Sequence, residues 1–508
     1  MDLYALSSDL SALGGLFGRT EICTPVDTIT RENVVSVLTH ALSIHSGNRS
    51  AIDYLYRYRR GEQPILGRSK TIRPEICNRI VENHAAEICQ FISSYCMGEP
   101  VTYVRRGKRE SASESIEKLN DYMYFEGKAT VDKRVMDWAA TCGVGYKMIL
   151  PDADSAEDEA PFSLDAPDPR DTFVVYHTGF GHKPVMGVRS IYRSRSGKTD
   201  TDVDTICCGY TTDHYFETVN GALRVWQPHL LGGIPIIEYD LNTARMGSFE
   251  PALSLLDAIN TVTSNRIDGV EQFVQSLMKF INCDVDDEDI KKIQELGAIK
   301  LRSFEGMNAD VQILTQELNQ MQVQTLIDYL YDQVLTICGV PTTKKGGTST
   351  SDTGTAVLLR DGFQQTEARA KDTELLYRMG ERSFLRLALN IIRNSDEEFD
   401  LKLSEIECKF TRRQLDNLQS KAQALLAQLQ AGIAPQIAIA HCGMYNDPAD
   451  VAAQSAQYLK KWDYVDPVDD VDEFPDAPDV GRGRIVAPND FSSKRPERPV
   501  QEGPMGDS

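Results

Sequence analysis

The sequence lacks the usual marks of an enzyme. No GxSxG nucleophile elbow occurs in its 508 residues. The segment SGKT at 196–199 ends like a phosphate-binding loop, but Tyr192 stands where that loop requires a glycine, so a hairpin turn is favoured. None of the 11 cysteines forms a CxxC pair, and their odd number favours reduced thiols over a disulfide framework. We therefore expect no catalytic residue and no cofactor.

Long apolar runs and a leader are missing too. No window of about 18 residues is apolar enough to span a bilayer. The N-terminus carries an acid at position 2 and no basic region, which is unlike a signal peptide. These absences predict a soluble, unexported protein with no membrane partner.

Positive charge is scarce: 54 lysines and arginines face 75 acidic residues, which gives a net charge of −21. Proteins that hold duplex DNA tightly usually carry a basic surface, because phosphate contacts supply much of the affinity. The sequence therefore disfavours a tight nucleic-acid binder and leaves room only for brief, weak contact with DNA.

No metal site is expected either. His177 with His182, and His214 with Glu217, match no standard ligand spacing. The acidic run DVDDED at 284–289 resembles a calcium loop, but Asp289 replaces the required glycine, so a helix N-terminus is the better interpretation.

The hydrophobic patterns predict an α+β, mainly helical chain. Helices are expected over 30–60, 73–97, 111–125 and 130–142, and short alternating strands over 171–240. Two further helices follow, each with an apolar stripe, and an acidic insert lies between them. The stripes comprise Leu256, Ile259, Ile267, Val270, Val274 and Leu277 in the first helix, and Ile327, Leu330 and Val334 in the second.

After the second helix comes a polar, glycine-rich loop, then a long helix from about 356 to 393, a strand within 400–410 and a helical C-terminal unit. The segment from Asp463 onward is rich in acids and proline, and we expect it to be disordered because it has little apolar surface to bury.

The stretch YRYRRGEQPILGR at 56–68 allows two interpretations. Arginines interleaved with tyrosines suit stacking and phosphate pairing in a nucleic-acid site. They also suit the last turn of a helix, where cations favour the dipole and Gly61 supplies the left-handed residue that follows. The helix end is favoured.

Five segments in the same order resemble tailed-phage portal proteins, most of all those of siphophages that infect Gram-positive bacteria. They are YRYRRGEQPILGR, ICNRIVENHAAEICQFISSYCMGEPVTYV, GGIPIIEYDLN, GSFEPALSLLDAINTVTSNRIDGVEQFVQSLM and CGVPTTKKGGTSTSDTGTAVLLR, and the likeness runs over about residues 30–460. In that family the Tyr/Arg-rich helix belongs to the outer wing, which again favours a helix end for residues 56–68.

The resemblance implies a portal fold with named parts. Residues 1–247 would form the wing (helical part 30–145, antiparallel β part 146–245), 248–280 and 316–340 the stem helices, 281–315 the clip, 341–355 the tunnel loop, 356–410 the long wing helix and strand, 411–462 the crown, and 463–508 the disordered tail. The clip acids would be Asp284, Asp286, Asp287, Glu288 and Asp289, and the DNA-facing tunnel loop would include Lys344, Lys345, Gly346, Gly347, Thr348 and Ser349.

The resemblance also implies a function. Twelve copies would form a ring at one capsid vertex, through which double-stranded DNA enters and leaves. The partners would be the large terminase subunit, scaffold and major capsid proteins, and a head-completion or adaptor protein, with assembly in the host cytoplasm. Two other classes are considered: a packaging ATPase, which the missing Walker loop opposes, and a monomeric nucleic-acid binder, which the net charge of −21 opposes.

Overall fold

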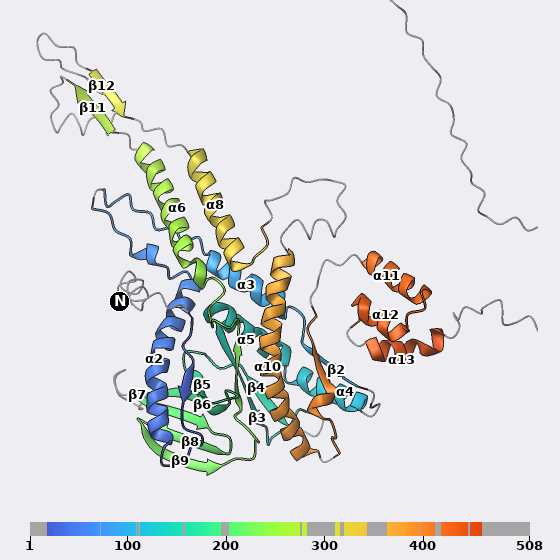
Figure 1. Ribbon diagram of the computed structural model, residues 1–508. Helices are drawn as coiled ribbons and strands as arrows, with labels where there is room; N and C mark the ends of the chain where they lie inside the picture. The colour runs from blue at the N-terminus through green and yellow to red at the C-terminus, as the bar shows by residue number, and fades with distance from the viewer. Residues whose placement is uncertain are drawn as a thin grey trace, which may run out of the picture. The chain divides into compact units, whose positions relative to one another are not determined.

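The computed structural model describes residues 18–71, 73–107, 109, 112–155, 159–194, 203–274, 277–281, 310–314, 320–342, 363–396, 398–411, 418–445 and 448–459. The chain divides into two compact units, Met1–Ala452 and Ala453–Ser508. The helices are α2 (Val34–Arg59), α3 (His84–Met97), α4 (Ala112–Phe125), α5 (Lys128–Cys142), α6 (Leu253–Val274), α8 (Gln320–Cys338), α10 (Phe363–Ser395), α11 (Leu418–Gln430), α12 (Pro435–Cys442) and α13 (Pro448–Leu459) (Figure 1). None of these described helices is long and apolar enough to cross a membrane.

The strands of the middle region form two separate sheets. The larger has the order β1-β5-β6-β7-β8-β9 and comprises β1 (Ile22–Thr24), β5 (Thr172–His177), β6 (Pro184–Ser194), β7 (Val203–Tyr210), β8 (His214–Val219) and β9 (Ala222–Pro228). Strand β1 runs parallel to β5, and the other pairs are antiparallel. The smaller sheet has the order β10-β3-β4, with β10 (Ile236–Asp240), β3 (Val144–Pro151) and β4 (Phe162–Asp165). The predicted antiparallel strands are confirmed, but they do not make one sheet.

Helix α2 packs on the larger sheet. Val34, Leu38 and Ala41 of the helix share an apolar cluster with buried residues of the strands, among them Phe173 and Phe216. The smaller sheet lies between two other cores, because β3 is buried on both sides. Its Met148 faces the core that contains α3 and α6, while Ile149 faces the core that contains α4 and α10.

A buried group of four charged side chains joins α5, β3 and α10. Lys128 and Asp132 of α5, Lys147 of β3 and Glu381 of α10 are all at most 2% exposed. The Lys147 ammonium lies 2.5 Å from the Asp132 carboxylate, and the Lys128 ammonium 3.1 Å from the Glu381 carboxylate; Lys128 also contacts Asp132, and Lys147 contacts Glu381. Two positive and two negative groups thus balance inside the core.

Tyrosines complete this charge group. The hydroxyls of Tyr103 and Tyr239 donate hydrogen bonds of 2.6 and 2.9 Å to the Glu381 carboxylate. Burial by itself would raise the pKa of Glu381, but the ammonium groups of Lys128 and Lys147 outweigh it and hold that pKa below its ordinary value. The group fixes α10 to β3 and, through β2 (Thr102–Arg105), to the short sheet that β2 forms with β13 (Ile406–Lys409).

The Tyr/Arg-rich stretch ends a helix, as favoured. Helix α2 stops at Arg59, and Gly61 has a φ of +93°. The arginines find partners within the chain: Arg57 pairs with Glu62 and Arg59 with Asp137, each at 2.7 Å. These ion pairs hold the end of α2 in place, and the interpretation of residues 56–68 as a helix end is confirmed.

The helix expected over 73–97 is wrong in its first part, since α3 begins only at His84. Arg73 has a φ of +53°, which a continuing right-handed helix does not permit. The backbone N–H groups of Asn78, Ile80 and Glu82 bond instead to side chains of α6, as described below. A contact with a distant helix has therefore replaced local helix formation.

Other elements lie close to their predicted positions. The long helix expected from 356 to 393 is α10, whose 33 residues give it a length of about 50 Å. Its expected first turns, and the tail from residue 463, lie outside the described residues. The helical segment expected at 411–462 contains α11 and α13 as predicted and, in addition, the short α12.

Candidate functional site: the paired helices α6 and α8

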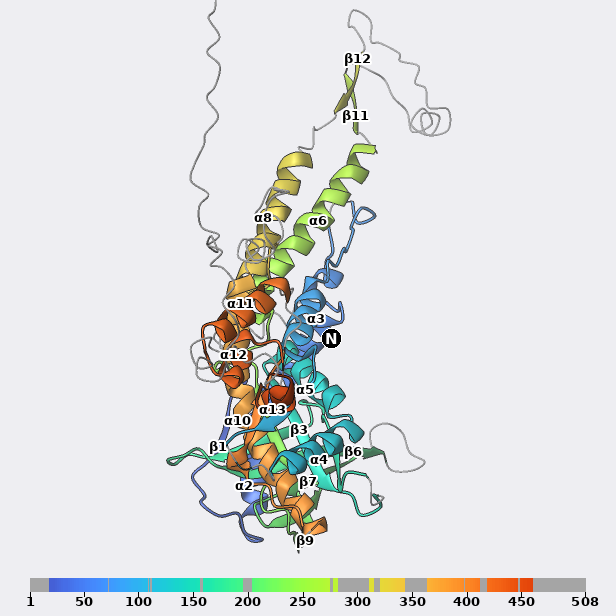
Figure 2. The same ribbon diagram turned by 90° about the vertical axis from the view of Figure 1, so that its right-hand side faces the viewer.

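Helices α6 and α8 lie side by side in two perpendicular views (Figures 1 and 2). Between them in the chain stands an antiparallel pair of strands, β11 (Leu277–Ile281) and β12 (Asp310–Leu314), in which Leu277 faces Leu314 and Ile281 faces Asp310. The pair brings the two ends of the acidic insert together. The acids Asp284, Asp286, Asp287, Glu288 and Asp289 lie outside the described residues.

The first helix is shorter than the expected 248–280. Residues Glu250–Ala252 form a 3-10 turn (η2), α6 ends at Val274, and Leu277 lies in strand β11 and not on the helix. The sequence LMKFI favours a strand because it is apolar and aromatic and has an antiparallel partner in DVQIL. The second helix, expected over 316–340, is described from Gln320 to Cys338.

The predicted stripe residues divide by burial. Leu256, Ile259, Ile327 and Val334 are buried, Ile267 and Leu330 are half-buried, and Val270 is 45% exposed. The side chains of Val274 and Leu277 lie outside the described ones. The stripe therefore fills a core at the inner end of the helices and meets solvent farther along α6.

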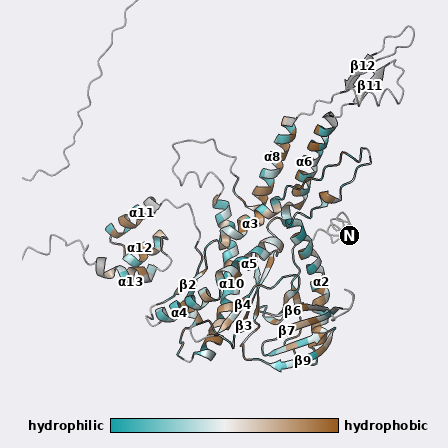
Figure 3. Ribbon diagram, turned by 180° about the vertical axis from the view of Figure 1, so that it is seen from behind, coloured by the Kyte–Doolittle hydropathy of each residue, from teal (hydrophilic) through white to brown (hydrophobic). Residues whose placement is uncertain are grey.

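Exposed apolar side chains continue on α8. Met321 is 80% exposed, Tyr329 59% and Leu326 45%. Both helices carry hydrophobic and hydrophilic residues interspersed along their length (Figure 3). A single copy of the chain leaves these apolar side chains in water, which is typical of a surface that contacts another protein.

A row of buried polar side chains on α6 binds a distant part of the backbone. The N–H groups of Asn78, Ile80 and Glu82 donate hydrogen bonds to the side chains of Asp268 (2.7 Å), Ser264 (3.0 Å) and Asn260 (2.8 Å). These three acceptors recur every fourth residue on one face of α6 and are at most 2% exposed. We call residues 78–82 the strap and the three hydrogen bonds its rungs.

Charged and polar side chains reinforce the ends of the strap. Asp268 pairs with Arg68 at 3.1 Å and also contacts Lys70. Burial by itself would raise the pKa of Asp268, but hydrogen bonds from Lys70 and Asn78 outweigh it and lower that pKa overall. The strap is thus bound to α6 by a carboxylate that stays ionised at neutral pH.

The start of α6 is fixed by a second buried ion pair. The Glu250 carboxylate accepts hydrogen bonds from the Arg19 guanidinium (2.6 Å) and from the backbone N–H groups of Gly18 (2.9 Å) and Gly247 (2.8 Å). The side chains of Arg19 and Glu250 are 2% and 3% exposed. The N-terminal segment, the loop before η2 and the 3-10 turn that leads into α6 are therefore joined at one carboxylate.

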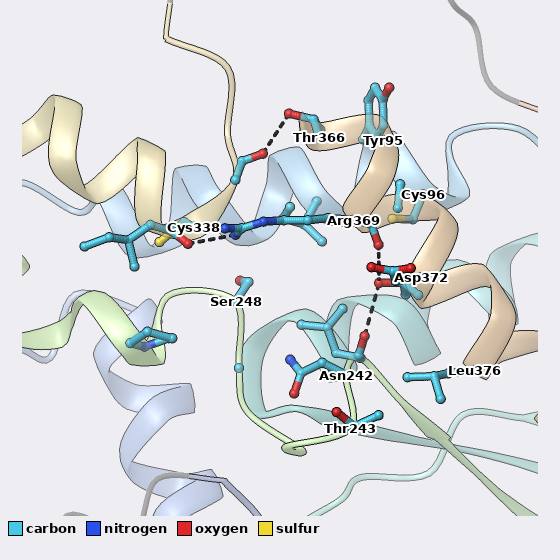
Figure 4. Close-up of a pocket in the computed structure, with 18 of the residues that line it drawn as sticks. Tyr95, Cys96, Asn242, Thr243, Ser248, Cys338, Thr366, Arg369, Asp372 and Leu376 are labelled. Atoms are coloured by element: carbon cyan, nitrogen blue, oxygen red, sulfur yellow. Dashed lines mark hydrogen bonds between the residues drawn. The ribbon is translucent and has the colours of Figure 1, made fainter. Parts of the chain in front are cut away.

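A cavity of about 560 Å³ lies where α8 ends (Figure 4). It is lined by α3, the loop after β10, the end of α8 and the first turns of α10, and its labelled residues include Tyr95, Cys338, Arg369 and Asp372. Burial raises the pKa of Cys338 to about 12, so this thiol stays protonated and is a poor nucleophile. The cavity offers no activated nucleophile among its described residues.

The walls of this cavity join the end of α8 to the start of α10. Arg369 donates a hydrogen bond of 2.7 Å to the carbonyl of Ile337, and Thr366 one of 2.7 Å to the carbonyl of Gly339. These bonds satisfy carbonyls at the end of α8, and Gly339 has a φ of +73°. The loop residues Lys344, Lys345, Gly346, Gly347, Thr348 and Ser349 lie outside the described residues, but the two helix ends that flank them are tied together.

The suspected phosphate-binding segment joins two antiparallel strands. SGKT at 196–199 falls between β6 and β7, which pair from Ser194 and Val203 onward. A nucleotide-binding loop leads from a strand into a helix, so this context opposes nucleotide binding. The hairpin interpretation is favoured by the strands on each side.

Sequence reasoning missed the strap. The signal was present, because Asn260, Ser264 and Asp268 recur at four-residue spacing beside the apolar stripe of the same helix. A stripe of hydrogen-bonding residues on the buried side of a helix indicates that polar groups pack there. The pattern does not reveal which segment supplies the donors.

Comparisons with known proteins show the family of the chain. The family model described as "Phage portal protein, SPP1 Gp6-like" matches residues 39–463. The portal protein of Bacillus phage SPP1 is 21% identical over 392 residues, which cover 73% of this chain and 74% of that protein. A solved structure, "Neck of empty GTA particle computed with C6 symmetry", matches 68% of this chain and 85% of that chain at 14% identity, with a TM-score of 0.37.

The family match and the SPP1 relative define the class of protein: it is a structural component of a phage head, a portal or connector and not an enzyme. More particularly, the chain belongs to the SPP1 Gp6-like family of phage portal proteins. Membership implies a multimeric ring that works with other phage head and tail proteins, and a place at the capsid of the virion.

Proposed function

We propose that twelve copies of this chain form a ring at one capsid vertex, with α6 and α8 as the stem helices around a channel for double-stranded DNA. One observation carries the proposal: the two helices stand together, yet Val270, Leu326 and Tyr329 remain 45%, 45% and 59% exposed in a single copy. Neighbouring copies in a ring would cover these side chains, because each copy offers the same surfaces in turn.

The acidic insert between β11 and β12 is proposed as the clip. Asp284, Asp286, Asp287, Glu288 and Asp289 would form a docking surface, first for the large terminase subunit and later for a head-completion or adaptor protein. The support is positional: the antiparallel pair gathers both ends of the insert at one place, next in the chain to the helices. Concentrated negative charge would select partners with complementary basic surfaces.

The loop between α8 and α10 is proposed as the tunnel loop that touches DNA. Within its segment 341–355, Lys344 and Lys345 are the cations, in a chain with a net charge of −21. A channel must let DNA slide, and every phosphate contact adds affinity that resists movement. Two lysines per copy, on a loop that follows the end of α8 bound by Arg369 and Thr366, would guide DNA without holding it.

The remaining parts follow the same scheme. The two sheets with α2 to α5 and α10 would form the wing, which contacts major capsid and scaffold proteins, and 411–462 would form the crown. Ring assembly would take place in the host cytoplasm, before DNA enters the capsid. The acidic tail at 463–508 has no role assigned in this proposal.

The test of ring formation uses two matched substitutions on α6. Val270→Asp places a charge on the exposed apolar side chain, whereas Thr261→Asp places the same charge about 180° around the helix. Thr261 is exposed and donates a hydrogen bond of 2.8 Å to the Asp257 carbonyl of its own helix. Native mass spectrometry should show large rings for the parent and for Thr261→Asp, and smaller species for Val270→Asp.

Two results would contradict the proposal. A parent chain that stays monomeric at high concentration, with and without scaffold protein, opposes ring formation outright. Rings of normal size from Val270→Asp, with unchanged stability against dilution, would show that this part of α6 does not form the subunit contact.

A packaging ATPase is the alternative function. It would require nucleotide turnover, and the chain offers neither a complete Walker loop nor a strand-to-helix setting for SGKT. Nucleotide binding that disappears with Lys198→Ala would favour this alternative.

A further inference from the structure

We propose that Glu21, Cys23 and His182 form a binding site for a divalent metal ion of the zinc class. One carboxylate oxygen, the thiol sulfur and one imidazole nitrogen all lie within 4.8 Å of one another. Among the histidine, cysteine, aspartate and glutamate residues that the structure describes, these three are the set whose potential ligand atoms converge in this way. This inference is independent of the proposed function.

The fold assembles the three residues from two distant segments. Cys23 lies in β1 opposite Tyr176 of β5, and Glu21 immediately precedes β1. His182 belongs to the turn between β5 and β6 and stacks its ring on Tyr176, with ring centroids 4.8 Å apart and planes 10° apart. Stacking on the Tyr176 ring thus positions the His182 imidazole on the side of β5 that lies next to β1.

The shape of the turn fixes His182 in this position. Gly181 and His182 have φ values of +88° and +44°, and the His182 N–H donates a hydrogen bond of 3.3 Å to the Gly179 carbonyl. The imidazole Nε2 then reaches the Glu21 carboxylate at 2.5 Å. The turn therefore holds the His182 imidazole next to Glu21 and Cys23.

The donor set suits zinc better than calcium or magnesium. Sulfur and nitrogen donors with one carboxylate are the ligands that Zn²⁺ and Co²⁺ take, whereas Mg²⁺ and Ca²⁺ prefer oxygen alone. Bond lengths of about 2.0–2.3 Å place two donors on one tetrahedral ion about 3.5 Å apart. A bound ion would draw the three donor atoms, which lie within 4.8 Å of one another, to that spacing and would leave one position of the tetrahedral shell for water.

An ordinary ion pair between Glu21 and His182 is the competing explanation. That pair is accessible, with side chains 41% and 45% exposed, and it needs no thiol beside it. The position of the half-buried Cys23 within reach of both groups distinguishes a metal site from an ion pair. The test must therefore report on the sulfur.

The experiment titrates the full-length chain with Co²⁺ and follows the near-ultraviolet charge-transfer absorption that a cobalt–thiolate bond produces. The parent should show this band at one ion per chain, and added Zn²⁺ should remove it. Cys23→Ser should abolish the band. Glu21→Gln and His182→Asn should weaken binding, and asparagine is chosen because it tolerates the positive φ at position 182.

Cys77→Ser is the matched control, because Cys77 is also half-buried and its thiol donates a hydrogen bond of 3.7 Å to the Arg68 carbonyl. It should leave the band unchanged. Circular dichroism of each variant checks that the fold is intact. The proposal is overturned if the parent shows no band, or if the band survives in Cys23→Ser or disappears in Cys77→Ser.

Discussion

Replacing Ser264 with alanine should free the middle of the strap while leaving α6 folded. The change removes the acceptor of the Ile80 N–H bond, which is 3.0 Å long, and almost no volume. A backbone donor left without a partner in a buried place costs about 1–3 kcal/mol. Because Ile80 is half-buried and water can reach part of this region, the lower half of that range is expected.

The size of the effect should follow the number of donors that lose an acceptor. Asp268→Ala removes the acceptor of Lys70 and of the Asn78 N–H, together with the ion pair to Arg68, so it should cost more than Ser264→Ala. Thr261→Ala is the control on the same helix, since Thr261 is exposed and bonds only to its own helix. Its cost should stay within about 0.5 kcal/mol.

Two measurements on the same samples separate the strap from the rest of the fold. Denaturant unfolding gives the free energy of unfolding, and hydrogen exchange gives the protection of the Asn78, Ile80 and Glu82 amides. Ser264→Ala should lower the protection of Ile80 most. Unchanged protection of Ile80, or an equal loss of stability in Thr261→Ala, would refute the role assigned to the rungs.

Three further predictions follow from the same structure. The folded-state pKa of Asp268 lies below its unfolded value, so the stabilisation by this carboxylate is complete above about pH 3.9 and is lost as the pH falls through the folded pKa. Hydrogen exchange of the strap amides should therefore show protection that falls over this pH range in the parent. In Asp268→Asn the protection should be lower from the start and should fall less. Glu381→Gln removes one of two buried carboxylates from beside two buried lysines and should destabilise the fold by about 3–5 kcal/mol in denaturant unfolding, whereas Glu367→Gln, on a more exposed part of α10, should cost far less. Changing Lys344 and Lys345 together to glutamate should reduce the DNA packaged per capsid while ring size and thermal stability stay close to the parent; normal packaging by intact mutant rings would exclude the contact with DNA.

Local patterns predicted most of the elements. The strands at 172–177, 214–219 and 222–228 begin and end where alternating apolar residues meet turn residues. The end of α2 at Arg59 follows from Gly61, and the end of α11 from Gly432, which has a φ of +78°. In these places the residues that decide the structure are neighbours in the chain, so the sequence is sufficient.

Contacts between distant segments could not be predicted in the same way. Residues 73–83 have a helical pattern, but acceptors nearly 200 positions away hold residues 78–82 extended. The parallel pairing of β1 with β5, the charge group around Glu381 and the approach of His182 to Cys23 also depend on segments far apart in the sequence. The clip acids and the tunnel-loop lysines lie outside the described residues and stay predictions.

The strap also limits how α6 can move. Four residues of a helix advance about 6.0 Å, and two residues of an extended chain advance about 6.6 Å. The spacing of the acceptors on α6 and the spacing of the strap N–H groups therefore differ by about 0.6 Å per rung. Three rungs tolerate this difference, as their hydrogen bonds of 2.7, 3.0 and 2.8 Å demonstrate. A slide of α6 along its axis by less than one full repeat would put all three acceptors out of register at once. Any axial displacement of α6 between residues 260 and 268 must therefore carry residues 78–82 with it, so the strap couples α6 mechanically to the segment that leads into α3.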